Sequence, residues 1–181
     1  MKYWFTADYH LGHANIIKYC NRPFKNLEHM NSEIIRRHNS RVKPNDTVFF
    51  LGDFCFKNSK NRGEGINIKA EHWIKQLNGN IIFIKGNHDN NNSLETIIEK
   101  IIIYYSGKYF CLVHNPEYVD IDVSINLVGH VHDKWRFKRI RKGFSFTDAI
   151  NVGVDAWNFY PITINEILKE YSKWLKNRGS I

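Results

Sequence analysis

Five apolar segments of the chain end directly in polar side chains that can bind a metal ion or transfer a proton. Each segment has the nearly unbroken apolar composition of a strand that is buried on both faces. A structural turn has no reason to repeat one chemistry, so the repetition indicates a shared site. The segments are Lys2–Ala7, Thr47–Leu51, Ile81–Ile84, Tyr109–Val113 and Ile125–Val128. The polar residues that follow them are Asp8 and His10, then Asp53, then Asn87, His88 and Asp89, then His114 and Asn115, then His130 and His132.

Apolar residues at helical spacing predict helices between these segments. Residues 27–40 carry one apolar stripe, which places Met30 and His38 at the edge of the core. Thr163 and Glu166 form a capping box before the last helix, and Ser93 is expected to cap another. The helices are expected at residues 13–20, 27–40, 67–78, 93–100 and 164–177, and a hairpin at residues 101–105 and 109–113.

The polar ends of the strands are expected to meet. Strands of an open α/β sheet present their carboxyl ends to one edge, and ligands bind there. On a continuing strand, residues at i and i+2 point to one face, which applies to Asp8 with His10 and to His130 with His132. The glycines before Asp53, Asn87 and His130 leave room where a β-carbon would crowd a metal ion. Two carboxylates, an amide and four imidazoles exceed the ligands of one tetrahedral zinc ion, but they suit two ions that share a carboxylate.

The motifs also resemble those of a known family. "DYH", "GD", "GNHD", a single His after a strand and "GHVH", in that order, are similar to the motifs of the calcineurin-like metallophosphoesterases. The resemblance runs from Asp8 to about Asn158, where "NVGVDAWN" is similar to the closing segment of small bacterial and phage members. It implies an α/β fold in which two mixed β-sheets pack as a sandwich with flanking helices, in four layers.

The resemblance also implies roles for the residues of the site. Asp8, His10 and His132 would hold one divalent ion, Asn87, His114 and His130 would hold the other, and Asp53 would bridge them. Nitrogen and oxygen ligands without thiolate favour Mn²⁺, with Fe, Ni or Zn as alternatives. A hydroxide between the ions would attack phosphorus. His88 would protonate the leaving oxygen as the general acid, with Asp89 orienting its ring, or else would have a supporting structural role.

Four more residues are candidates for contact with the substrate. His13 and Asn15 stand at a helix start and would bind phosphate or simply cap the helix. Arg22 offers a bidentate fork for phosphate, although an exposed arginine at a helix end is the simpler interpretation. Asn115 follows a ligand and would touch the substrate. For Asp155 and Trp157, packing beneath the site is favoured.

Length and composition set further expectations. The 181 residues predict a single domain over residues 1–181 without a cap domain. The chain has no apolar run long enough for a membrane span or a signal peptide, so a soluble, cytoplasmic protein is predicted. Cys20, Cys55 and Cys111 are expected to be reduced, and Cys55 to be a buried filler more than a metal ligand. The formal charge of +8 favours an anionic substrate.

The substrate is less well defined. "GDFCF" lacks the Asp-Arg-Gly continuation of the family's protein phosphatases, and an uncapped site suits a phosphodiester, with a small nucleotide-type substrate favoured. The segment Lys134–Lys142 has six basic residues out of nine. We expect a hairpin strand with a solvated basic face there, but a metal-dependent nuclease on single-stranded DNA or RNA is an alternative. A non-catalytic, metal-stabilised nucleic-acid-binding module is a third hypothesis. The polar loop 57–65 is expected beside the metals as a surface loop or a cover, and the sequence does not determine the oligomeric state.

Overall fold

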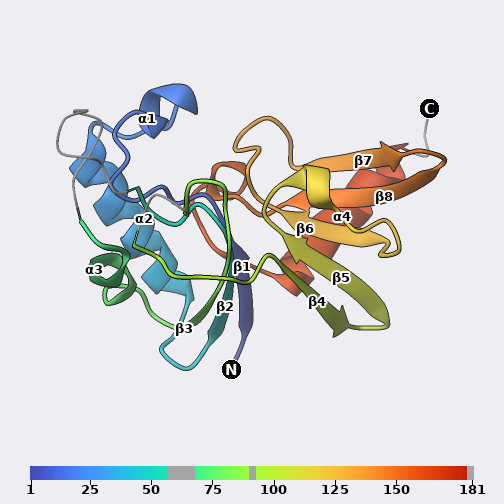
Figure 1. The fold of residues 1–181 in the computed structure, drawn as a ribbon, viewed down its shortest axis with the longest axis horizontal. Coiled ribbons are helices and arrows are strands. Elements are labelled where there is room, and N and C mark those ends of the chain that lie inside the picture. The colour runs from blue at the N-terminus through green and yellow to red at the C-terminus, as the bar shows by residue number, and fades with distance from the viewer. Residues whose placement is uncertain (57–67, 90–92, 179–181) are drawn as a thin grey trace.

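Two mixed β-sheets form the framework of the protein (Figure 1). The computed structural model describes residues 1–56, 68–89 and 93–178. The first sheet has the order β3-β2-β1-β9, in which β1, β2 and β3 run parallel and β9 is antiparallel to β1. Its strands are β1 (Tyr3–Thr6), β2 (Thr47–Leu51), β3 (Asn80–Ile84) and β9 (Ile162–Thr163).

The second sheet has the order β4-β5-β6-β8-β7. Its three central strands run parallel, and the two edge strands are antiparallel to their neighbours. Its strands are β4 (Lys100–Tyr105), β5 (Lys108–Val113), β6 (Ile125–Val128), β7 (Phe137–Lys142) and β8 (Ser145–Asn151). All five apolar segments are therefore strands, as predicted, and so are the hairpin of β4 with β5 and the basic hairpin strand β7.

The inner faces of the two sheets form a continuous apolar core, which confirms the predicted sandwich. Phe5, Leu51 and Ile84 from the first sheet pack in one buried cluster with Phe110 and Ile150 from the second. Side chains alternate along each strand, so the residues between them face the other way. In β2, Phe50 stands between Phe49 and Leu51, so it faces away from the second sheet and packs on the helices.

Helices α2 (Leu27–Arg41) and α3 (Ala70–Ile74) lie on the side of the first sheet that faces away from the second (Figure 1). Met30 is fully buried there, and so is His38, although the sequence analysis placed both at the edge of the core. A histidine can be buried in this place because each ring nitrogen has a partner: Nδ1 lies 2.8 Å from Tyr9 Oη and Nε2 lies 2.8 Å from the Asn78 carbonyl.

Helix α4 (Ile164–Arg178) begins at the predicted capping box. Glu166 Oε2 accepts the N–H of Thr163 at 2.8 Å, and Thr163 Oγ1 accepts the N–H of Glu166 at 3.4 Å. The first turns of α4 join the core between the sheets through Ile164 and Ile167. The remaining helical segments are short: α1 (Ile16–Tyr19), and the 3₁₀ turns η2 (Pro116–Tyr118) and η3 (Val154–Trp157).

One predicted helix is wrong, and two are shorter than expected. Residues 94–99 form no helix; they lead into β4 in irregular structure. Ser93 does cap a helix, but it is α3: its Oγ accepts the N–H of Ala70 at 2.6 Å. This contact joins residues far apart in sequence, which a local capping pattern does not show. The helices expected at residues 13–20 and 67–78 are limited to Ile16–Tyr19 and Ala70–Ile74. Loop 57–65 lies outside the described residues. Among those residues, no helix has the length and apolar character needed to cross a membrane.

Candidate metal centre

All seven predicted metal ligands come together where the carboxyl ends of β1, β2, β3, β5 and β6 meet. They form two clusters, and within each the potential ligand atoms of the acidic and histidine side chains lie within 4.8 Å of one another. The first cluster consists of Asp8, His10 and His132, and the second of Asp53, His114 and His130. The amide oxygen of Asn87 belongs with the second cluster, since it lies 3.0 Å from His114 Nε2 and 2.8 Å from His130 Nδ1.

The carboxylate of Asp53 lies between the two clusters. Its Oδ2 is 3.6 Å from His10 Nε2 on one side and 3.3 Å from His114 Nε2 on the other. Its Oδ1 accepts the backbone N–H of His88 at 2.9 Å. One oxygen of Asp53 is therefore within reach of ligands from both clusters, which is the position that a bridging carboxylate needs.

The backbone around the ligands is left-handed, contrary to our expectation of continuing strands. Asp8, His10, Asp53, His130 and His132 all have positive φ, between 49° and 70°. Strand β1 ends at Thr6 and β6 at Val128, so the i, i+2 pairs converge through left-handed turns and not through the alternation of a strand. For residues other than glycine this conformation costs about 1–2 kcal/mol each. Backbone hydrogen bonds hold it: Asp8 N donates to Gly52 O at 3.0 Å and His10 N to Asp53 O at 3.1 Å.

The glycines of the motifs make room for the carboxylates. A β-carbon on Gly86 would lie 2.2 Å from Asp53 Oδ1, and one on Gly129 would lie 2.9 Å from Asp8 Oδ2. The sequence analysis placed this crowding on the metal ions, but the structure places it on their ligands. Any side chain at either position would displace a ligand oxygen.

Three histidines are arranged to offer a nitrogen lone pair. His114 Nδ1 lies 2.7 Å from the Leu51 carbonyl, to which it donates its hydrogen, so Nε2 faces the cluster with its lone pair. His132 Nδ1 lies 3.0 Å from Asp155 Oδ2, which leaves its Nε2 for the first cluster. His10 Nε2 is buried and has no hydrogen-bond partner among the residues that the structure describes. Because a buried polar atom without a partner is costly, this nitrogen fits a cation.

Buried carboxylates create a demand for positive charge. Burial raises the pKa of Asp8 to about 6. Burial alone would lower the pKa of His114, but the hydrogen bond with Asp53 and the charge of Asp8 raise it to about 9. Burial also acts to lower the pKa of His132, but the hydrogen bond with Asp155 outweighs burial and raises this pKa to about 10. Positive charge is therefore stabilised at both clusters, and the donors are those that divalent transition-metal ions prefer.

Asp89 joins the loops that follow β2 and β3. Its buried carboxylate accepts the backbone N–H groups of Gly86 at 2.7 Å, Asp53 at 2.9 Å and Phe54 at 3.2 Å. The predicted contact with the His88 ring is not among these three hydrogen bonds. The ring of His88 is partly exposed, and its centroid lies 5.4 Å from that of His10.

Arg22 is buried and occupied, so the prediction that it binds substrate phosphate is wrong, and so is the alternative of an exposed arginine. Its Nε and Nη2 each donate to Asp155 at 2.8 Å. Nη2 also donates to the carbonyl of Asp8 at 2.7 Å, and Nη1 to that of Tyr9 at 3.0 Å. The guanidinium thus fixes the backbone of one ligand and, through Asp155, the ring of His132. The sequence showed no sign of this pair, because its members are 133 residues apart.

The sequence analysis missed Asn151, which holds the loop of His132 in place. Its Nδ2 donates to the carbonyls of His132 at 2.7 Å and Trp135 at 2.9 Å. The backbone carbonyl of Asn151 accepts the indole N–H of Trp157 at 2.7 Å, which agrees with packing of Trp157 beneath the site. A signal was available, because Asn151 ends strand β8 as the polar residues of the other motifs follow theirs.

The structure places the other candidates around the clusters. The buried ring of His13 stacks on Phe56 at 4.3 Å, with its centroid 5.8 Å from that of His10. Asn15 precedes α1, which has four residues and therefore a weak dipole for binding an anion. Asn115 caps η2, since its Oδ1 accepts the N–H of Glu117 at 2.9 Å. Substrate contacts of these three residues stay predictions.

Cys20, Cys55 and Cys111, all within the described residues, form no disulfide bond. Burial, with the nearby charge of Asp89, raises the pKa of Cys55 to about 12. A thiol with that pKa is a poor metal ligand near neutral pH, which agrees with its expected role as a buried filler.

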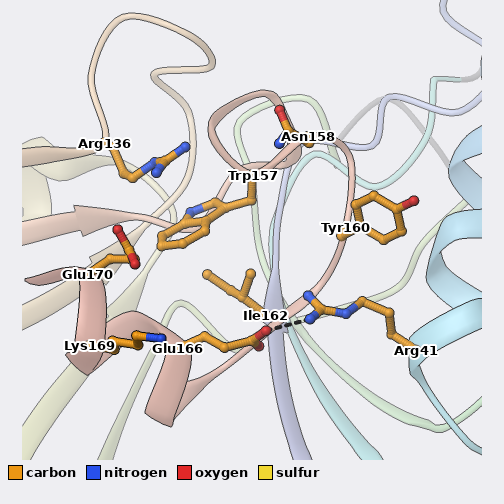
Figure 2. Close-up of a pocket in the computed structure, with 9 residues that line it drawn as sticks. All are labelled: Arg41, Arg136, Trp157, Asn158, Tyr160, Ile162, Glu166, Lys169 and Glu170. Atoms are coloured by element: carbon orange, nitrogen blue, oxygen red, sulfur yellow. Dashed lines mark hydrogen bonds and ion pairs between the residues drawn. The ribbon is translucent and has the colours of Figure 1, made fainter.

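Two cavities lie near these elements. One of about 640 Å³ adjoins the second cluster, because Asn87 and His114 are part of its wall. The other, of about 500 Å³, contains none of the metal-ligand candidates (Figure 2). Figure 2 shows Arg136 beside the indole of Trp157, and Arg41 paired with Glu166 across the pocket; the Arg136 guanidinium lies 4.4 Å from the Trp157 ring centroid.

Comparison with known proteins gives consistent matches. Residues 1–179 match the family "Calcineurin-like phosphoesterase". The uncharacterized protein MJ1445 from Methanocaldococcus jannaschii is 38% identical in an alignment that covers 95% of this chain and 92% of that protein. The crystal structure of AQ665, a protein of unknown function from Aquifex aeolicus, has a TM-score of 0.65 at 25% identity and covers 92% of this chain and 97% of its own. The crystal structure of nuclease MPE from Pseudomonas putida is more distant, with a TM-score of 0.49 at 19% identity, and covers 83% of this chain and 72% of its own.

Replacement of Asp155 by Asn should weaken metal binding at the first cluster alone. The change removes the charge that orients His132, and the loss of such a supporting partner typically lowers metal affinity about 10- to 100-fold. Calorimetric titration of the metal-free protein with Mn²⁺ should show one weakened and one unchanged binding event. Asp148→Asn is the matched control, since Asp148 is also buried and paired with an arginine, but on β8. Equal weakening of both events would contradict the assignment.

Proposed function

Since the chain belongs to the calcineurin-like phosphoesterases, we propose that it hydrolyses a phosphodiester, of a small nucleotide type, with the aid of two divalent cations. The observation that carries the proposal is the position of Asp53. One carboxylate oxygen within 3.6 Å of nitrogens from both clusters makes two separate mononuclear sites a poor description. A bridging carboxylate is instead the usual way to hold two cations about 3.5–4 Å apart.

Each ligand then has an assigned cation. Asp8, His10 and His132 would hold one, Asn87, His114 and His130 would hold the other, and Asp53 would bridge them. Mn²⁺ is the preferred ion, and Fe, Ni or Zn would fit the same nitrogen and oxygen donors. When bound, two such cations lower the pKa of coordinated water and neutralise charge that develops on the phosphoryl oxygens.

His88 is the proposed general acid. Its backbone is anchored by the Asp53 carboxylate, and its partly exposed ring lies beside the ring of His10. In the reaction a water oxygen joins phosphorus and gives up one proton to solvent, the bond from phosphorus to the leaving oxygen breaks, and that oxygen takes the proton from His88, which regains one from solvent. Arg22, Asp155 and Asn151 act through the ligands that they position.

A purely structural role for the cations has less support. Structural zinc sites are closed by four Cys or His ligands, whereas these clusters contain no thiolate among the described residues. Asn87 is exposed and His130 is partly exposed. A substrate oxygen can therefore approach the second cluster.

A nuclease is the alternative activity, and the basic segment Lys134–Lys142 is the feature that suggests it. Most of its charged groups already have partners within the chain. Arg139 pairs with Asp148 at 2.7 Å, Arg136 stacks on Trp157, and Lys142 Nζ donates to two carbonyls of the η2 region. Fewer cations remain to follow a phosphate backbone, so we favour the small substrate.

Replacement of Lys134, Arg136 and Lys138 together by Gln should leave hydrolysis of bis-p-nitrophenyl phosphate unchanged. That activity should also depend weakly on salt, because a small diester contacts few cations. Binding along a phosphate backbone would instead fall by about 0.7–0.9 log units per neutralised phosphate for each tenfold rise in salt. Assays at low and high salt, with a single-stranded oligonucleotide in parallel, test this. A strong, salt-sensitive oligonucleotide activity that the triple change abolishes would establish a nuclease.

His88→Ala should lose turnover without losing metal. Removal of a general acid typically costs about 10²- to 10⁴-fold in rate. The loss should be large for a dinucleotide, whose alkoxide leaving group needs a proton, and smaller for bis-p-nitrophenyl phosphate, because p-nitrophenolate departs without one. Metal content should stay equal to that of the wild type. His72→Ala, an exposed histidine on α3, is the control. Equal losses on both substrates would show that His88 stabilises charge and does not donate a proton.

A further inference from the structure

The cavity beside the second cluster is larger than a phosphate requires. It has a volume of about 640 Å³, and Asn87 and His114 form the part of its wall nearest the cations. Sites for small organic ligands typically span about 300–1,000 Å³. A phosphodiester whose phosphorus lies at the cations would therefore extend one of its ester groups into this cavity.

Tyr118 presents an aromatic ring at the cavity on a fixed support. Its side chain is 67% exposed, and it stands on the single turn η2. That turn is held at both ends: Asn115 caps its start, and Lys142 Nζ donates to the carbonyls of Glu117 at 2.7 Å and Val119 at 3.2 Å. A ring on a rigid support loses little freedom when a ligand stacks on it.

Apart from Val113, the other side chains of the wall are polar or charged. Lys85, Lys100 and Glu99 contribute to it, and the Lys100 ammonium is paired with Asp120 at 3.1 Å. An apolar ligand would remove these groups from water without replacing their hydrogen bonds. A ligand that suits the wall has a flat ring to stack and many hydrogen-bonding edges. Nucleobases with their sugar hydroxyls have both.

We propose that this cavity binds the nucleoside of a nucleotide phosphodiester, with its base stacked on Tyr118. The inference rests on the proposed function, because it places the phosphorus at the two cations. Asn87 and His114 would hold the cations that bind the phosphate, and the nucleoside would lie along the part of the wall that includes Asn115 and Tyr118. Selectivity for nucleotide esters over simple alkyl esters then comes from Tyr118 and not from the metal ligands.

The pocket in Figure 2 is a weaker candidate for a base. Its two aromatic rings are already covered by cations: Arg136 lies 4.4 Å from the Trp157 centroid, and Arg37 lies 5.3 Å from that of Tyr160. A base would have to displace a guanidinium to stack there. Tyr118, in contrast, has none of the ring contacts observed for the aromatic residues of the described chain.

The test uses two chromogenic substrates with the same leaving group, p-nitrophenyl thymidine 5′-phosphate and methyl p-nitrophenyl phosphate, whose remaining ester group has no ring to stack. Tyr118→Ala should raise KM for the thymidine ester about tenfold, the effect of losing one base–aromatic stack, with little change in kcat. Its KM for methyl p-nitrophenyl phosphate should stay within about twofold of the wild type, a difference too small to reflect a lost stack. Tyr118→Phe keeps the ring and should behave as the wild type. Tyr109→Ala removes another exposed tyrosine, on β5, and should change KM for neither substrate.

An equal change on both substrates, or none on either, would overturn the inference. Absence of hydrolysis of bis-p-nitrophenyl phosphate by the wild type with Mn²⁺ would contradict the proposed function instead. A binding measurement separates the two failures, because it needs no turnover. Calorimetric titration with thymidine 5′-phosphate should show about tenfold weaker binding to Tyr118→Ala than to the wild type or to Tyr118→Phe. Equal affinity of all three proteins would overturn the nucleoside site whatever the activity.

Discussion

The structure of the site depends on one buried carboxylate, that of Asp53, and on how closely the chain packs around it. Asp53 Oδ2 faces nitrogens of both clusters, while Oδ1 accepts the N–H of His88. Its own N–H binds Asp89, which also binds the N–H of Gly86. Since a β-carbon on Gly86 would lie 2.2 Å from Asp53 Oδ1, the loops after β2 and β3 can approach this closely only with glycine there. The two loops therefore hold the carboxylate as one unit.

Charge explains the arrangement around that unit. Asp8, Asp53 and Asp155 are buried within a small volume, and such a concentration of negative charge is stable only beside positive charge. Arg22 supplies part of this positive charge from the buried side of the site. The raised pKa values of His114 and His132 indicate that protons are stabilised at the clusters. Two divalent cations would supply the same charge from the solvent side of the site, where Asn87 is exposed. The metal-binding side is thereby open to a substrate and the opposite side is closed by Arg22.

The sequence predicts well which candidate ligands come together, because each of them follows a recognisable apolar strand. Local patterns show where a strand ends and which donor comes next, and the parallel order brings those ends together. Other features depend on contacts that no local pattern contains. The residues around Arg22 do not indicate its pairing with Asp155, which is distant in the sequence. Nor do those around Ser93 indicate that it caps a helix that precedes it in the chain. The left-handed backbone at Asp8 and His130 was also missed, because it is imposed by hydrogen bonds between loops and not by residue type.

The most direct test of the account is the number of cations that the chain holds with and without the Asp53 carboxylate. Wild-type protein and Asp53→Asn would be dialysed to equilibrium against the same concentration of Mn²⁺, and bound metal would be counted by elemental analysis, with Asp148→Asn as the control. If one carboxylate joins the clusters, the wild type and the control should bind close to two ions per chain, and Asp53→Asn about one or fewer. A single ion in the wild type, or two in Asp53→Asn with full activity, would contradict a bridged pair of cations.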